Sequence, residues 1–438
     1  MKARIVPLFF QPGRDEAFDQ QLARLKTLLS DEAEILDALA LGTPLPEADA
    51  VVFPQLLGEA YRQLGAFQAI QVPILVITSE FGTVSMWDWE IASYLKSEGV
   101  QTIAPYNLEQ ARLICRSLGV KRELSQAKFL VFQDNPGEGF QAEIFKRFYW
   151  WEEECTRRMQ ERFGLRIVKK SFKTLGARAQ EIPDQEAEAA LAGRKWQAAG
   201  LTPRALNSAA KIYLAVKAEL EQDGAILGSG INCLNESHFS DTTPCLAWNM
   251  LYEEQGLVWG CEADTMSMLS MFILHRSLGA PAMMTNLYPF LLGQAALKHE
   301  RIPDFPDVDA PENYILSAHC GYLGVLPVSF STQWTLRPKV LAIVDENASA
   351  IDARLPLGPV TLAKLGPGMD KLSVVEGELV DYAQYPGSDC LNGAVLRVPD
   401  GRRLMDALES HHYLILVGHQ RTNIEFIARV FDLQVEVL

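Results

Sequence analysis

The sequence predicts an α/β protein: two doubly wound, parallel-sheet N-terminal domains followed by a β-rich, barrel-like C-terminal domain. Over residues 1–300, apolar strand-like runs alternate with segments of helical periodicity, a pattern typical of parallel sheets covered by helices. The segment 302–313 is rich in proline and acidic residues and marks a junction. After it, short apolar segments separated by Pro, Gly and Asp turns indicate a barrel or sandwich. We place the three domains at 1–122, 123–300 and 301–438.

Composition limits the function classes. The 438 residues suffice for two to four domains, and 48% hydrophobic residues provide real cores. The net charge of −15 argues against a nucleic-acid partner and leaves sugars, neutral metabolites and metal ions. The most apolar window, 278–297, contains glycines, prolines and an amide, so we expect a core segment and no membrane partner. The N-terminus is interpreted as a strand and turn rather than a signal peptide, and seven cysteines without paired spacing favour the cytoplasm.

The first domain is expected to alternate strands and helices. A polar turn at 79–82 follows its last strand, and a helix cap is a better interpretation of this turn than a substrate contact. The predicted elements are strands at 3–10, 34–39, 50–54 and 73–78 and helices at 16–29, 58–65 and 86–96.

The second domain begins with a strand at 127–133. The turn 134–142 matches G-x-G-x-x-A, but the following strand, 165–170, ends in lysines instead of the acid that a dinucleotide ribose requires, so we discount such a site. A long helix is predicted over 143–163 and a strand over 224–233. Nearby cysteines and a histidine lack the paired spacing of structural zinc sites.

Residues 257–288 form the segment most informative about function. A strand-like run ending at Gly260 is followed by Glu262 and Asp264, then by a helix from Met266 and a second strand-like piece that reaches Asn286. In parallel sheets, ligands bind beyond the carboxyl ends of the strands. We therefore predict that Glu262 and Asn286 face one pocket. Asp264 is either a catalytic acid or, as we favour, the cap of the helix.

The Cys-Glu-x-Asp run at 261–264, followed by a polar strand end at Asn286, resembles the L-fucose and L-arabinose isomerase family. The resemblance covers roughly residues 230–438. It implies two Rossmann-like domains followed by a β-rich one, and an oligomer, a hexamer or similar, whose pockets borrow residues from a neighbour. It also implies a divalent metal, usually manganese, held by two carboxylates and a late histidine. Asn286 stands where the second carboxylate is expected, and an amide is a weaker ligand and no base.

Two histidine segments match the family pattern. His319 follows an apolar pair and is expected to bind metal, because the family places a metal histidine between the carboxylates and the terminal one. His412 lies directly before the apolar strand 413–418 and is predicted as the terminal ligand. His411 is expected to point to the opposite face. The predicted metal ligands are thus Glu262, His412 and His319; the catalytic residues Glu262, Asn286 and Asp264; and the substrate contacts Asn286, His411 and Trp334.

The chemistry implied is proton transfer between C1 and C2 of an open-chain sugar through an enediol, with Mn²⁺ or another divalent metal stabilising charge on its oxygens. Glu262 would be both ligand and base. Three explanations for Asn286 stay open: Asp264 replaces the lost acid, one carboxylate with a histidine and metal-bound water suffices, or the chemistry is gone. The alternatives to an isomerase are a catalytically impaired sugar-binding protein on the same fold and an α/β lyase or epimerase.

Overall fold

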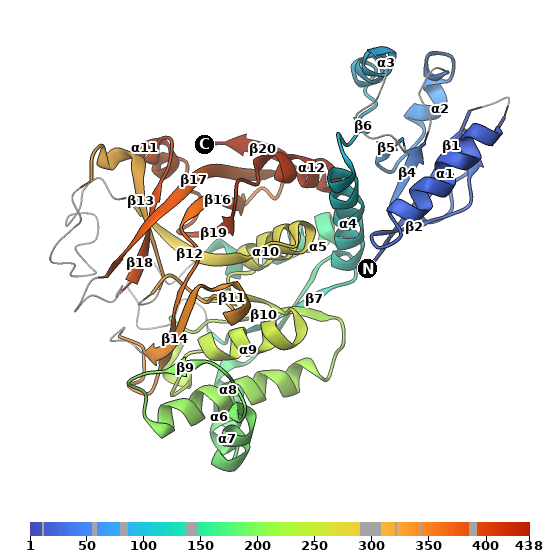
Figure 1. Ribbon diagram of the computed structural model, residues 1–438. Coiled ribbons are helices and arrows are strands. Elements are labelled where there is room, and N and C mark those ends of the chain that lie inside the picture. Colours follow the sequence, from blue (N-terminus) through green and yellow to red (C-terminus); the bar gives the residue numbers. More distant parts are fainter. Residues whose placement is uncertain are drawn as a thin grey trace. The chain divides into compact units, whose positions relative to one another are not determined.

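The computed structural model describes residues 1–10, 13–54, 59–78, 86–135, 148–289, 308–319, 322–340, 344–384 and 392–438 (Figure 1). The chain forms two compact units. The first comprises 1–125, 276–278 and 422–434, and the second comprises 126–275, 279–421 and 435–438. The predicted boundary at 122 lies close to the end of the first segment, and the boundary at 300 falls outside the described residues. The turn 79–82 also lies outside them.

The first unit contains a parallel sheet with the strand order β2-β1-β4-β5-β6 and a short strand β3 beside β1. Asp15 caps α1 by accepting a hydrogen bond from the Phe18 amide, 2.8 Å away. Lys121 donates to the Val430 carbonyl oxygen at 2.8 Å and so ties α12 to α4. The strands are β1 Ala3–Phe9, β2 Ala33–Ile35, β3 Leu39–Ala40, β4 Ala50–Phe53, β5 Ile74–Val76 and β6 Thr102–Ile103; the helices are α1 Glu16–Leu28, α2 Leu64–Gln68, α3 Met86–Ser97, α4 Leu108–Leu124 and α12 Arg421–Phe431.

The second unit contains a four-stranded parallel sheet in the order β11-β10-β7-β8. The helix predicted over 143–163 is confirmed over Glu153–Phe163, which is α5. It is wrong over the described residues before that, where a 3-10 turn covers Tyr149–Trp151 and Glu152 is extended. The strands are β7 Lys128–Phe132, β8 Arg166–Lys170, β10 Ile226–Ile231 and β11 Val258–Cys261; the helices are α5 Glu153–Phe163, α6 Phe172–Glu181, α7 Asp184–Leu191, α8 Pro203–Leu220, α9 Cys245–Gln255 and α10 Thr265–Leu278.

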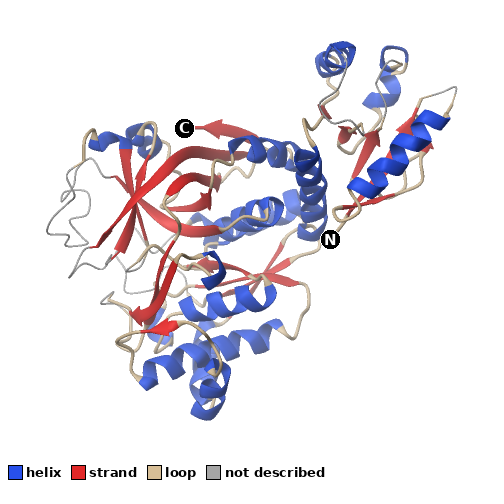
Figure 2. Ribbon diagram, in the orientation of Figure 1, coloured by secondary structure: helices blue, strands red, loops and turns tan. Residues whose placement is uncertain are grey.

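The β-rich region of the second unit is mostly one sheet with the strand order β16-β19-β12-β13-β18-β17-β20. Strand β16 also pairs with β17, so the six strands from β16 to β17 form a closed ring (Figure 2). A smaller sheet has the order β15-β14-β9. The strands are β9 Gln197–Ala198, β12 Ala282–Pro289, β13 Tyr314–Ala318, β14 Gln333–Pro338, β15 Ser349–Arg354, β16 Gly358–Leu365, β17 Lys371–Gln384, β18 Asn392–Arg397, β19 His412–Val417 and β20 Gln434–Val437; α11 is Gly401–Asp406.

The structure confirms a mixed α/β chain with parallel sheets and a separate β-rich region. One detail is wrong: the strand after α10 does not join the parallel sheet. It is β12, which pairs antiparallel with β13 and β19. Helix α10 lies between the four-stranded parallel sheet and the large β-rich sheet (Figure 1). The hydroxyl of its Ser270 accepts a hydrogen bond from the Leu365 amide of β16 at 3.1 Å. No helix in the described part of the chain is both long and apolar enough to cross a lipid bilayer.

Candidate metal centre

Glu262 lies in a tight turn between β11 and α10. Glu262 and Ala263 both have left-handed backbones, with φ of 52° and 53°. Such a conformation is costly for residues other than glycine and needs support from its surroundings. Two indole N–H groups supply it, because Trp150 and Trp151 donate to the Glu262 carbonyl oxygen at 3.2 and 2.8 Å. Both indoles belong to the 3-10 turn Tyr149–Trp151, which precedes α5.

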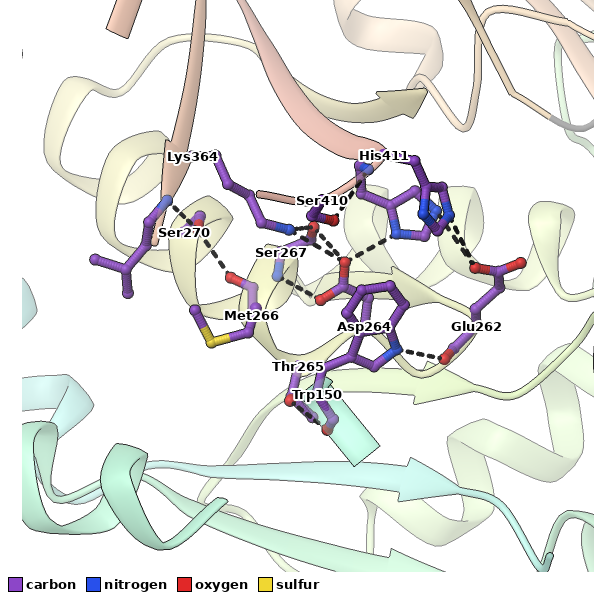
Figure 3. Close-up of polar contacts among 12 residues, drawn as sticks. Trp150, Glu262, Asp264, Thr265, Met266, Ser267, Ser270, Lys364, Ser410 and His411 are labelled. Carbon is purple, nitrogen blue, oxygen red and sulfur yellow. Dashed lines mark hydrogen bonds and ion pairs between the residues drawn. The ribbon is translucent and has the colours of Figure 1, made fainter. Parts of the chain in front are cut away.

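Asp264 is the N-cap residue of α10 and is fully buried. One of its carboxylate oxygens accepts a hydrogen bond from the Ser267 amide at 2.8 Å, so the predicted cap is confirmed. The other oxygen lies 2.8 Å from Nδ1 of His412 and 3.2 Å from Nζ of Lys364, and it accepts a hydrogen bond from the Ser267 hydroxyl (Figure 3). The carboxylate thus joins α10 to strands β19 and β16.

Burial acts on every ionisable group of this network. Burial alone would raise the pKa of the Asp264 carboxyl, but the Lys364 ammonium and the His412 hydrogen bond outweigh it and hold that pKa well below its usual value. For Lys364, burial lowers the pKa, and Asp264 opposes the shift only in part. Burial and the neighbouring His411 lower the pKa of His412 to about 4. His412 is therefore neutral near pH 7, the form in which a histidine binds metal.

Three side chains from two distant segments converge beside this network. Oε2 of Glu262 lies 3.3 Å from Nε2 of His411 and 3.6 Å from Nε2 of His412 (Figure 3). One ligand atom from each of the three residues lies within 4.8 Å of the others. We call Glu262, His411 and His412 the metal-ligand group.

The donor atoms of this group fit a divalent cation. Nε2 of His412 is buried and has no hydrogen-bond partner among the residues that the structure describes. Asp264 accepts a hydrogen bond from Nδ1 of His412, which leaves the lone pair on Nε2 facing Glu262. A carboxylate that orients a histidine in this way is typical of protein metal sites. Two imidazoles and one carboxylate suit manganese, iron, cobalt or zinc.

The prediction that His411 points away from the site is wrong. Side chains alternate between faces only inside a strand, and β19 begins at His412, so the alternation does not apply to His411. Instead, its ring centroid lies 4.1 Å from that of His412. His411 therefore belongs to the metal-ligand group.

Asn286 and His319 both lie next to His412 without belonging to that group. Asn286 is paired with His412 across β12 and β19, and its Nδ2 donates to the Tyr288 hydroxyl at 3.2 Å. Its Oδ1 is buried and has no hydrogen-bond partner among the described residues. The ring of His319 stacks on His412 with centroids 5.2 Å apart. The predicted metal role of His319 stays a prediction, and the contact that the structure gives it here is the ring of His412.

Trp334 has the contacts of a core residue. It lies in β14, and its indole donates to the Leu326 carbonyl oxygen at 2.9 Å. Its ring packs against Trp196 at 5.5 Å, and the side chain is buried. The structure gives it no contact with the metal-ligand group, and its predicted role in substrate binding stays a prediction.

Sequence reasoning missed Lys364 and Trp150. Lys364 is a single lysine within the apolar run of β16, and a charged residue inside a buried strand is rare unless it is paired. Trp150 lies in an aromatic run within the segment predicted as a helix. Both residues are unusual for their segments in the sequence. The sequence does not show, however, which distant residue either of them contacts.

We expect Asp264→Asn to weaken Mn²⁺ binding by about 10- to 100-fold. Losses of this size are typical when a carboxylate that orients a metal-ligating histidine is removed. The amide can present its NH₂ to Nδ1 and so favour the wrong tautomer of His412. Isothermal titration calorimetry with Mn²⁺ measures the effect. The control is Asp241→Asn, which changes a half-buried aspartate of the same unit. Equal affinities for wild type and Asp264→Asn would contradict the role given to Asp264.

A comparison with models of known protein families gives no match, and a search among curated proteins finds no similar sequence either.

Proposed function

We propose that this protein is a cytoplasmic, metal-dependent aldose–ketose isomerase of the L-fucose and L-arabinose isomerase type, built of two Rossmann-like domains and a β-barrel. One observation carries the proposal: Glu262 and His411, which are 149 residues apart, bring a carboxylate and an imidazole together at 3.3 Å, with His412 beside them. Manganese or another divalent cation is the expected cofactor, and a homo-oligomer, hexameric by resemblance, is the expected assembly.

The chain supplies the groups that this reaction needs. When bound, a divalent cation would withdraw electron density from the carbonyl and hydroxyl oxygens at C1 and C2 of an open-chain sugar. Glu262 has two carboxylate oxygens, so one could bind the metal while the other takes the proton from C2 of the aldose and delivers it to C1. The hydroxyl proton on O2 moves to O1 in the same interconversion. Asp264 orients His412, and the indoles of Trp150 and Trp151 hold the Glu262 backbone.

Asn286 favours a second candidate function. A neutral amide recognises hydroxyl groups, but it cannot act as a base, so a sugar-binding protein with impaired catalysis fits the same site. The buried Oδ1 without a partner among the described residues is an acceptor for a sugar hydroxyl in either function.

The deciding experiment is an isomerisation screen over pentoses, hexoses and deoxyhexoses, with Mn²⁺ and with a chelator, together with measurement of bound metal. Turnover that depends on Mn²⁺ supports the isomerase. Sugar binding that is unaffected by the chelator, without turnover, supports the binding protein. Neither turnover nor sugar binding would contradict both.

We expect Asn286→Asp to raise the affinity for Mn²⁺ by about tenfold, or 1.4 kcal/mol, because a carboxylate then stands opposite His412. Titration calorimetry measures the change, and Asn286→Ala is the control, since it removes the amide without adding charge. Isomerase activity that appears only in Asn286→Asp would mean that the natural chain has lost its metal chemistry. An unchanged affinity would mean that residue 286 does not reach the cation.

A further inference from the structure

Two buried cysteines lie side by side at one end of the four-stranded parallel sheet. Sγ of Cys233, shortly after β10, is 3.3 Å from Sγ of Cys261, the last residue of β11. Both thiols are reduced, and the two residues are 6% and 8% exposed. The sulfurs of a disulfide are about 2.05 Å apart, so this pair has to close by roughly 1.2 Å to form one. The proposed mechanism makes no use of either thiol.

The backbone joins this pair of cysteines to the turn that carries Glu262. The Ile231 carbonyl oxygen accepts hydrogen bonds from the Cys233 amide at 2.8 Å and from the Ala263 amide at 2.9 Å. Cys261 directly precedes Glu262 in the chain. Because Glu262 and Ala263 already have left-handed backbones, the turn has few other conformations open to it. A movement of either cysteine therefore displaces the backbone of a metal ligand.

A small cavity gives an oxidant access to Cys261. Its volume is about 20 Å³, and Cys261 is part of its wall. Val325 and Lys339 also line the cavity and are partly exposed, so it lies close to the protein surface. A space of about 10–15 Å³ is enough for one water, and hydrogen peroxide is not much larger than water. Of the two thiols, the one in the described wall is that of Cys261, and it meets the oxidant first.

We propose that Cys233 and Cys261 form a redox-sensitive dithiol, which hydrogen peroxide converts to a disulfide that weakens cation binding by the metal-ligand group. In the first step the Cys261 sulfur attacks one peroxide oxygen, the O–O bond breaks, and Cys261 becomes a sulfenic acid as one water leaves. In the second step the Cys233 sulfur attacks the Cys261 sulfur, the S–O bond breaks, and another water leaves. The two sulfurs lose two electrons, and the peroxide accepts them.

The arrangement of the pair favours the second step over the first. Buried thiols react slowly with oxidants, so the first step is expected to need minutes at millimolar peroxide. The sulfenic acid then forms with the Cys233 thiol already beside it, which makes the second step fast. The disulfide does not depend on the proposed function. Its effect on a bound cation rests on the metal centre of that proposal.

The test treats the full-length, metal-free protein with hydrogen peroxide, removes the peroxide with catalase and then titrates Mn²⁺ by calorimetry. Peptide mapping by mass spectrometry without reductant is expected to show a disulfide between Cys233 and Cys261. The affinity for Mn²⁺ should fall by about tenfold or more, because a ligand site tolerates displacements of only about 0.5 Å. Dithiothreitol should restore the affinity of the untreated protein.

Three variants keep the result interpretable. Cys261→Ser removes the thiol that peroxide reaches first, so its Mn²⁺ affinity should be the same before and after treatment. If Cys261→Ser fails to fold, Cys233→Ser takes its place, and treatment should then give an oxidised Cys261 but no disulfide. Cys245→Ser changes another cysteine in the wall of the same cavity and should respond to peroxide as wild type does.

Failure of the dithiol and failure of the proposed function give different results. Treated wild-type protein without the disulfide between Cys233 and Cys261 would overturn the proposal, and so would a disulfide that leaves the Mn²⁺ affinity unchanged. If the reduced protein binds no Mn²⁺, the metal centre and the proposed function fail. Hydrogen exchange of the peptide that contains Glu262 then decides between the outcomes, since exchange that is equal in the reduced and disulfide forms would overturn the link to the turn.

Discussion

Glu262→Gln is expected to lower the affinity for Mn²⁺ by at least about 100-fold, or 2.8 kcal/mol. Glu262 is the one carboxylate in the metal-ligand group, and glutamine is nearly the same size but carries no charge. Two neutral imidazoles are a poor site for manganese, which prefers oxygen ligands. Metal content after dialysis and titration calorimetry measure the effect, and any isomerase activity should disappear with it.

The control for this variant is Glu161→Gln, which alters an exposed glutamate on α5 whose contact is an ion pair with Arg157. Circular dichroism of both variants shows whether the fold is kept. Full Mn²⁺ occupancy at wild-type affinity in Glu262→Gln would refute the metal centre.

Lys364→Met is expected to destabilise the second unit by about 3–5 kcal/mol. The side chains of Lys364 and Asp264 are 3% and 0% exposed, so neither charge is screened by solvent. Methionine fills similar space but leaves the Asp264 carboxylate buried with His412 and Ser267 as its remaining side-chain partners. Urea unfolding followed by tryptophan fluorescence measures the loss, since several tryptophans lie in this unit.

Two controls separate this pair from ordinary ion pairs. Lys211→Met breaks a pair in which Asp184 is largely exposed, and it should cost at most about 1 kcal/mol. The double variant Lys364→Met/Asp264→Asn removes both charges and should cost less than the sum of the single variants, because no unpaired charge is left. A Lys364→Met protein as stable as wild type would contradict the importance of the buried pair.

Local signals in the sequence predicted much of the site. The apolar run before Gly260 predicted β11, and the acid two residues after Glu262 predicted the cap of α10, which the Ser267 amide confirms. The apolar run after His412 predicted β19. These features depend on residues within one turn or one strand of each other, so a single segment contains the information.

The pattern of residues along the chain is sufficient to predict the alternation of strands and helices, the β-rich character of the last third, and Glu262 and His412 as candidate ligands. The fold decides which strands are neighbours: β12 pairs with β19, so Asn286 faces His412 from the β-rich sheet and not from the parallel one. It also decided that His411 joins Glu262, and that Lys364 reaches Asp264 from 100 residues away. Periodicity records which face of a segment is buried, but not against which distant segment, because many pairings bury the same apolar area.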